Sequence, residues 1–163
     1  MEIIEYNEKY YLDLATMISL FRVTLRRFKN IESKPNIEDA KEELEEYITY
    51  KKKYKIYLCI EDDKALGYII LRIDGVIWVE QIYVLEESRR KGVASLLYDF
   101  SENVSKAMGE DTLYNYVHPN NNAIINFLKS KDYTVINLIE IRKKYNGEET
   151  LSKIKIMDNE FDY

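Results

Sequence analysis

The stretch from Val79 to Leu97, VEQIYVLEESRRKGVASLL, constrains the fold most, because an apolar strand runs through a charged loop into a long helix. Arg89, Arg90 and Lys91 stand directly before Gly92, which opens that helix. The first N–H groups of a helix have no partner inside it and carry the positive end of its dipole, so they bind phosphate. A glycine lets the backbone approach an anion with no Cβ in the way. The stretch therefore predicts a loop that holds a pyrophosphate.

Composition indicates an ordinary globular protein. The chain has 163 residues, of which 46% are apolar and 33% charged. We expect one domain over residues 1–163, in which 147–163 form a last strand and a loose acidic tail. The net charge of −5 argues against a nucleic-acid partner and would tolerate a cationic small molecule or a basic peptide terminus. No segment approaches the ~18 apolar residues of a membrane span, so we expect a cytoplasmic protein with no membrane contact.

The cysteine and histidine content excludes some chemistry. Cys59 is the only cysteine and lies in the apolar run Ile56–Ile60, which is typical of a buried core thiol and leaves no intrachain disulfide. His118 is the only histidine, so the nitrogen and sulfur ligands that zinc prefers cannot be assembled. We therefore expect no metal.

Hydrophobic periodicity predicts an α+β fold. A helix follows Asn7 as far as about Phe28, and a second helix follows Pro35 with Asn36 as its cap. Asp74-Gly75 between apolar runs is a strong hairpin signal. The predicted strands are Glu2–Tyr6, Ile56–Glu61, Leu66–Ile73, Val76–Val84, Thr112–Val117, Tyr133–Ile141 and Leu151–Met157.

Two further helices complete the pattern. One runs from Gly92 to Gly109, and the other starts at Asn120-Asn121-Asn122. The strand, helix and strand between Val76 and Val117 imply a parallel pair. We expect a mixed, mostly antiparallel central sheet of about six to seven strands with about four helices.

The loop and its surroundings resemble the coenzyme A site of the GNAT (Gcn5-related N-acetyltransferase) superfamily. Arg89-x-x-Gly92-x-Ala94 fits the central motif of that family, and Ile82-Tyr83-Val84 supplies the strand end before it. The stretch from Asn121 to Tyr133, NNAIINFLKSKDY, is similar to the asparagine-led helix of the family. The order of elements also matches along nearly the whole chain.

The resemblance implies that the protein transfers an acetyl group directly from acetyl-CoA to a primary amine of a small molecule or of a protein. The backbone of Ile82 to Val84 would pair with the pantetheine arm where the two parallel strands splay apart. A backbone N–H at the strand end would polarise the thioester carbonyl. Asn121 would bond the arm from the far side. The pyrophosphate would be held by Arg89, Arg90, Lys91, Gly92, Val93, Ala94 and Ser95.

The catalytic residues are less clear from the resemblance. Acyl transfer needs a base for the amine and an acid for the departing thiolate. Glu80 is the candidate base, although a solvent-facing strand carboxylate is an equal interpretation. Leu128 stands where many relatives have a tyrosine acid, and Tyr116 stands where a subgroup has a glutamate. Tyr116, Tyr83 and Tyr133 are substitutes for the acid, and His118 is placed to relay a proton. For each of these residues a role in packing is an alternative interpretation.

Three other hypotheses compete with an acetyltransferase. The strongest is a non-catalytic acetyl-CoA-binding domain on the same fold, which the missing tyrosine favours. A P-loop nucleotide enzyme is disfavoured because no Gly-x4-Gly-Lys-Ser/Thr occurs. A plain interaction module would bind no ligand. The acceptor amine depends on Phe21 to Lys34 and on the late strands, and the apolar final strands would permit a homodimer.

Overall fold

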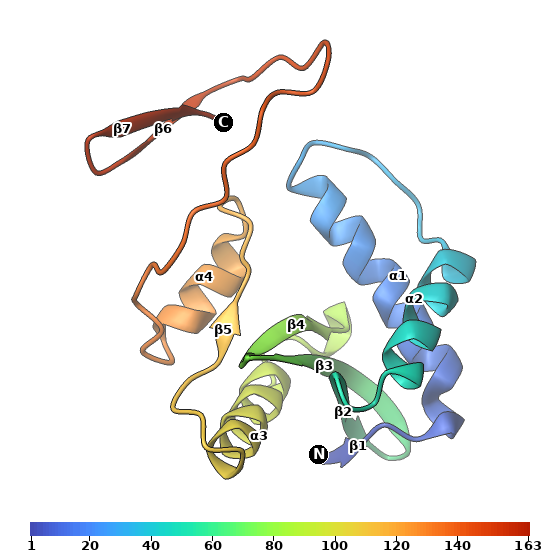
Figure 1. Cartoon of the computed structure of the whole chain (residues 1–163). Coiled ribbons are helices and arrows are strands. Elements are labelled where there is room, and N and C mark those ends of the chain that lie inside the picture. Colours follow the sequence, from blue (N-terminus) through green and yellow to red (C-terminus); the bar gives the residue numbers. More distant parts are fainter. The chain divides into compact units, whose positions relative to one another are not determined.

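Five strands form a mixed sheet at the centre of the first of two units (Figure 1). The computed structural model describes residues 1–163, of which Met1–Phe127 form this unit and Leu128–Tyr163 the second. The strands cross the sheet in sequence order; the first four are antiparallel neighbours and the last pair is parallel. They are β1 (Glu2–Glu5), β2 (Tyr54–Glu61), β3 (Lys64–Asp74), β4 (Val76–Val84) and β5 (Tyr114–Asn115).

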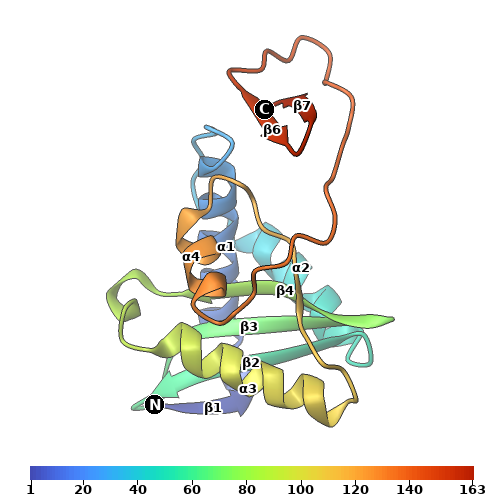
Figure 2. The same ribbon diagram turned by 90° about the vertical axis from the view of Figure 1, so that its left-hand side faces the viewer.

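Four α-helices accompany the sheet: α1 (Tyr11–Arg27), α2 (Ile37–Thr49), α3 (Val93–Ala107) and α4 (Asn122–Lys129). Short 3-10 turns precede α1 (η1, Glu8–Tyr10) and α3 (η2, Glu86–Ser88). Figures 1 and 2 show α1 and α2 on one face of the sheet and α3 on the other. The predicted α+β class, its parallel pair and its four helices are confirmed, but the central sheet has five strands and not six or seven.

The core follows the alternation of side chains along β3. Tyr68 and Ile70 are fully buried and belong to the cluster that includes Leu14 of α1 and Leu44 of α2. Alternation directs Ile69, also fully buried, to the opposite face. That face is covered by α3, whose Phe100 ring meets the ring of Tyr57 edge-on at 4.8 Å. The sheet is therefore covered on both faces.

Local signals in the sequence set several boundaries. Asn36 caps α2, since its Oδ1 accepts hydrogen bonds from the N–H groups of Glu38 and Asp39 at 3.1 and 3.3 Å. Gly75, at a φ of +70°, makes the turn between β3 and β4. The fifth strand is shorter than the predicted Thr112–Val117, because only two of its residues pair with β4.

The second unit contains a two-stranded antiparallel hairpin, β6 (Lys153–Ile156) and β7 (Asn159–Asp162). β6 lies within the predicted strand Leu151–Met157. The prediction of a strand over Tyr133–Ile141 is wrong, since those residues adopt no regular structure. Their β-branched pattern favours a strand, but β6 and β7 pair with each other and leave it no strand partner within its own unit. Val135 in this segment is 87% exposed.

None of the helices is both long enough and apolar enough to cross a membrane.

Candidate active site

The parallel strands β4 and β5 pair only at their beginnings. Trp78 lies opposite Tyr114 and Val79 opposite Asn115, and no pair follows. β4 continues for five more residues, from Glu80 to Val84, while β5 ends at Asn115. The edge of β4 on the β5 side is therefore open over its second half, which is the splay that the resemblance implied.

The hydrogen bonds on the other edge show which groups of β4 face this opening. The N–H of Leu85 donates to the carbonyl of Leu66 at 3.0 Å, so Leu85 is bonded to the β3 side. In an antiparallel ladder bonded and non-bonded residues alternate, which directs the N–H and C=O of Ile82 and Val84 to the open edge. The Val84 carbonyl is consistent with this direction, since it accepts a hydrogen bond from Nε of Arg89, outside the β3–β4 ladder, at 3.1 Å.

The open edge leads directly to the start of α3. Gly92 is the N-cap of α3 at a φ of +87°, in the left-handed region that favours glycine, and it offers no side-chain cap. A Cβ at this position would meet no atom within 4 Å, so the space next to the glycine is open. The N–H groups of Val93, Ala94 and Ser95 follow as the first of the helix, and its first turn has no acidic residue. This is an uncapped, positively polarised helix end that fits an anion.

The three cations that were predicted to hold the pyrophosphate differ in their contacts within the protein. Arg89 is fixed by Val84, by an ion pair with Glu86 at 3.6 Å, and by stacking over the ring of Tyr83 at 5.6 Å. Arg90 and Lys91 are exposed and form no ion pair, and Arg90 takes a left-handed φ of +59°. Two exposed, unpaired charges and one anchored charge thus surround the start of α3.

Asn121 lies at the start of α4. Its Oδ1 accepts a hydrogen bond from the N–H of Ile124 at 3.2 Å, and its carbonyl accepts one from the N–H of Ile125 at 3.1 Å. The residue therefore caps the helix, and its side-chain oxygen is used within the protein. The predicted bond from Asn121 to a pantetheine arm would have to come from its NH₂ group.

Glu80 is the extra residue of a β-bulge. Val79 pairs with Leu71 and Gln81 pairs with Ile70, so Glu80 has no partner on β3. Its carboxylate accepts a hydrogen bond from Nε of Arg72 at 2.8 Å, and Arg72 also bonds Asp74 at 2.7 Å. The bulge settles which face Glu80 occupies: it lies on the side of α1 and α2 and lines a cavity there.

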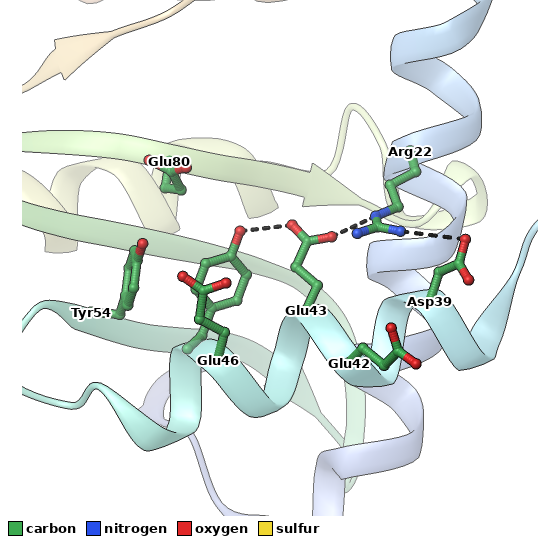
Figure 3. Close-up of a pocket in the computed structure, with 8 residues that line it drawn as sticks. Arg22, Asp39, Glu42, Glu43, Glu46, Tyr54 and Glu80 are labelled. Atoms are coloured by element: carbon green, nitrogen blue, oxygen red, sulfur yellow. Dashed lines mark hydrogen bonds and ion pairs between the residues drawn. The ribbon is translucent and has the colours of Figure 1, made fainter.

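This cavity, of about 490 Å³, is strongly acidic (Figure 3). Its lining has five carboxylates and a single cation, Arg22, which makes it a site for positive charge. The lining residues come from α1, α2, β2 and β4, all within the first unit. They are Arg22, Asp39, Glu42, Glu43, Glu46, Tyr47, Tyr54 and Glu80.

A buried polar network forms one wall of the cavity. Glu43 accepts hydrogen bonds from Nε of Arg22 at 2.5 Å, from the hydroxyl of Tyr47 at 2.7 Å, and from Nε2 of Gln81. Gln81 in turn accepts one from the hydroxyl of Tyr68 at 2.7 Å. The pKa of Tyr47 is raised first by burial and then by its bond to Glu43. The network ties α1 and α2 to the strand that carries Glu80.

The candidates for the acid lie in different surroundings. Tyr116 is 67% exposed and stacks on the indole of Trp78 at 4.4 Å, and Trp78 also packs against Arg72 at 5.3 Å. His118 stacks on Phe28 near the end of α1 at 5.7 Å, and its Nδ1 accepts from the N–H of Asn120. Burial, with a smaller effect of Lys29, lowers the pKa of His118. Tyr116 therefore lies next to Trp78, whose ring also contacts Arg72, the partner of Glu80. His118 lies beside the end of α1.

Tyr83 and Tyr133 were also named as substitutes for the acid. Tyr83 is buried in the first unit, where its ring meets that of Phe21 at 6.5 Å, and burial raises its pKa. Tyr133 belongs to the second unit.

Comparison of the sequence with models of known protein families gives a match. Residues 20–133 match the model of the acetyltransferase (GNAT) family, which is more than half of the chain. The chain belongs to the GNAT family. It is therefore an acetyltransferase by family, and the matched region contains β4, the loop before α3, and the whole of α4. No curated protein matches the sequence significantly.

Solved GNAT structures share the fold. A crystal structure of a probable acetyltransferase aligns with a TM-score of 0.70 at 20% identity, over 91% of this chain and 100% of that one. The aminoglycoside 6'-N-acetyltransferase AAC(6')-Ig from Acinetobacter haemolyticus aligns with a TM-score of 0.65 at 20% identity, over 89% and 99%. The aminoglycoside acetyltransferase meta-AAC0020 from an uncultured soil metagenomic sample, in complex with sisomicin, aligns at 0.66 and 12% identity, over 88% and 95%. At these identities the likeness shows the fold of this GNAT protein and not its substrate.

Sequence reasoning missed most of the acidic cavity. Asp39, Glu42, Glu43 and Glu46 occupy positions i, i+3, i+4 and i+7 along α2, which is the spacing of one helix face. That spacing was a usable signal for an acidic stripe. Gln81, which bonds Glu43, and Tyr54, which lines the same cavity, come from strands distant in the sequence, and no local pattern marks them.

Proposed function

We propose that the protein transfers an acetyl group from acetyl-CoA directly to an amine. The proposal is carried by one continuous feature, the open edge of β4 that runs from Ile82 past Val84 to the uncapped start of α3 at Gly92. An extended arm can pair with the free N–H and C=O groups of such an edge, and a diphosphate fits the start of the helix. Acetyl-CoA has both parts, joined in that order.

The residues of this chain would have the following roles in binding and proton transfer. Arg89 to Ser95 would hold the diphosphate, and the N–H of Ile82 would donate to the thioester oxygen as charge develops there. Glu80, oriented by Arg72, would take a proton from the attacking amine. The new N–C bond forms as the C–S bond breaks, the thiolate takes a proton from Tyr116 or through His118, and the second proton of the amine nitrogen replaces the one that this acid gives up. Acetyl-CoA itself supplies the acyl group.

The acceptor is a cationic amine on this proposal. An amine arrives protonated at neutral pH, and the cavity that contains Glu80 carries five carboxylates against one arginine. Such a cavity concentrates cations near the base that must deprotonate them. A neutral acceptor gains no attraction from this excess of negative charge, and an anionic acceptor is repelled by it.

A non-catalytic acetyl-CoA-binding domain is the second candidate, because Leu128 occupies the position of the usual tyrosine acid. Thermal unfolding with acetyl-CoA and, separately, with ATP tests binding. At ~100 times its dissociation constant a ligand adds roughly 2.7 kcal/mol, a rise of roughly 5–10 °C for a domain of this size. Release of free CoA thiol over a panel of amines then tests turnover. A shift with ATP alone would refute both candidates, and a shift with acetyl-CoA without thiol release would leave the second.

A further inference from the structure

We propose that Tyr98 of α3 is a positioning residue that acts through Asn115 of β5. Together they fix the closed end of the opening beside β4, and so limit the length of the acyl chain that fits there. This role rests on the proposed function, because it concerns the acyl end of the same opening. It adds that the protein distinguishes acetyl-CoA from CoA thioesters of longer acyl chains.

The opening ends where the sheet is weakly paired. β5 contributes only Tyr114 and Asn115, and the pair of Val79 with Asn115 is the last before the two strands separate. The next residue, Tyr116, is 67% exposed and stacks on Trp78. Two pairs of a parallel ladder supply few hydrogen bonds. The position of Asn115 therefore depends on contacts outside the ladder.

Tyr98 supplies such a contact. Its hydroxyl donates a hydrogen bond to Oδ1 of Asn115 at 3.1 Å and accepts one from Nδ2 at 2.9 Å. Tyr98 is fully buried, and its ring meets the ring of Phe127 on α4 edge-on at 5.4 Å. A buried side chain in a close-packed interior has few alternative positions. Tyr98 therefore anchors the end of β5 to α3.

The acyl group of a bound donor would extend toward this end. In the proposed function the diphosphate is held at Gly92 and the N–H of Ile82 donates to the thioester oxygen, so the acyl chain points from Ile82 toward Val79. The gap narrows in that direction to the ordinary strand spacing of about 4.8 Å at the last pair, where no further chain fits. Separation of that pair would lengthen the opening by one residue, about 3.3 Å. The last pair thus sets how far an acyl chain can reach.

Two variants release this end from opposite sides. Tyr98→Phe keeps the ring and its contact with Phe127 but leaves the amide of Asn115 without the hydroxyl, and Asn115→Leu removes the same bond. Tyr57→Phe is the matched control. Tyr57 is also buried and packs against Phe100 of α3, but its hydroxyl makes no hydrogen bond. Thermal unfolding of each variant checks that it is folded.

Hydrogen exchange of the free protein tests the anchor without any ligand. The amides that bond β4 to β5 should exchange about tenfold faster in Tyr98→Phe and in Asn115→Leu, and at the wild-type rate in Tyr57→Phe. The double variant should exchange no faster than either single variant, because both remove one bond. Unchanged exchange in both single variants would overturn the anchor, whatever the protein binds.

Calorimetry with acetyl-CoA, propionyl-CoA and butyryl-CoA tests the choice of donor. We expect the wild type and Tyr57→Phe to bind acetyl-CoA at least about tenfold more tightly than butyryl-CoA, with propionyl-CoA between them. Tyr98→Phe and Asn115→Leu should lose most of that preference and keep their affinity for acetyl-CoA. Equal binding of the three by the wild type, or an unchanged preference in both variants, would overturn the role of Tyr98 and leave acetyl transfer standing. Binding of none of the three by the wild type would refute the proposed function, and this role with it.

Discussion

Glu80 and Gln81 are consecutive residues of β4, yet both side chains lie on the same face of the sheet. Glu80 bonds Arg72, and Gln81 bonds Tyr68 and Tyr47 on the side of α1 and α2. In a regular strand these neighbours would point to opposite faces, and the bulge at Glu80 removes that alternation. Gln81 can then bond the side chains of α2 while Glu80 lines the cavity.

This arrangement predicts a specific effect of Glu80→Gln. If Glu80 is the base, an amide that cannot accept the proton should lower kcat by about 10²- to 10⁴-fold, with little change in the affinity for acetyl-CoA. Steady-state thiol release and calorimetry would measure the two quantities. Asp74→Asn is the control, because Asp74 bonds the same Arg72 outside the cavity. Equal losses in both variants would show that Arg72 placement, and not the base, had been disturbed.

Gly92 and Gly109 form a matched pair at the two ends of α3. Their φ angles are +87° and +86°, and a Cβ would meet no atom within 4 Å at either position. Alanine at each should cause a similar loss of about 1–2 kcal/mol of stability, because both require a left-handed backbone. Only Gly92→Ala should also weaken acetyl-CoA binding, and Gly92→Glu should abolish it by placing a like charge in the anion site. Wild-type affinity in Gly92→Glu would show that this loop is not the site.

The buried network predicts a stability effect at Tyr68. Tyr68→Phe removes the hydroxyl that donates to Gln81 and leaves a buried acceptor unsatisfied, which costs about 1–3 kcal/mol. Tyr57→Phe is the control: Tyr57 is also buried, but its hydroxyl makes no hydrogen bond, so we expect a change within about 0.5 kcal/mol. Urea unfolding would measure both. Equal losses would mean that ring packing, and not the hydrogen bond, explains the effect.

The sequence predicted the local parts of the site because local rules control them. The glycine before α3, the cations beside it and the cap at Asn36 each depend on a few adjacent residues. The bulge at Glu80 was not predictable in this way, since it is a register shift between two strands. The Glu43–Gln81 bond joins residues 38 positions apart and depends on where α2 docks. The strand predicted over Tyr133–Ile141 failed for a related reason: propensity favours an extended chain, but only a neighbouring strand makes it a sheet.

His118 predicts a pH dependence with a definite sign. Burial and Lys29 lower its folded pKa below the ordinary value of 6.5, so the unfolded chain binds a proton more readily than the folded one. Its contribution to stability should be fully present above pH 6.5 and lost as the pH falls through the lower folded pKa. As the only histidine, it gives one imidazole signal in an NMR titration. Urea unfolding at pH 7 and pH 5, repeated with His118→Asn, would isolate its share, and a folded pKa above 6.5 would contradict the prediction.

Cys59 should be unreactive in the folded protein. It is fully buried on β2, and burial raises the pKa of its thiol, which lowers the fraction of nucleophilic thiolate. A thiol reagent such as DTNB should therefore label no cysteine under native conditions and one after unfolding in guanidinium. The result matters for the assay of this family, because free thiol released from acetyl-CoA can be followed with the same reagent only if the protein gives no background. Cys59→Ser should behave as the wild type in turnover. Rapid labelling of the native wild type would show that β2 opens readily and would contradict the closed packing of α3 over this face of the sheet.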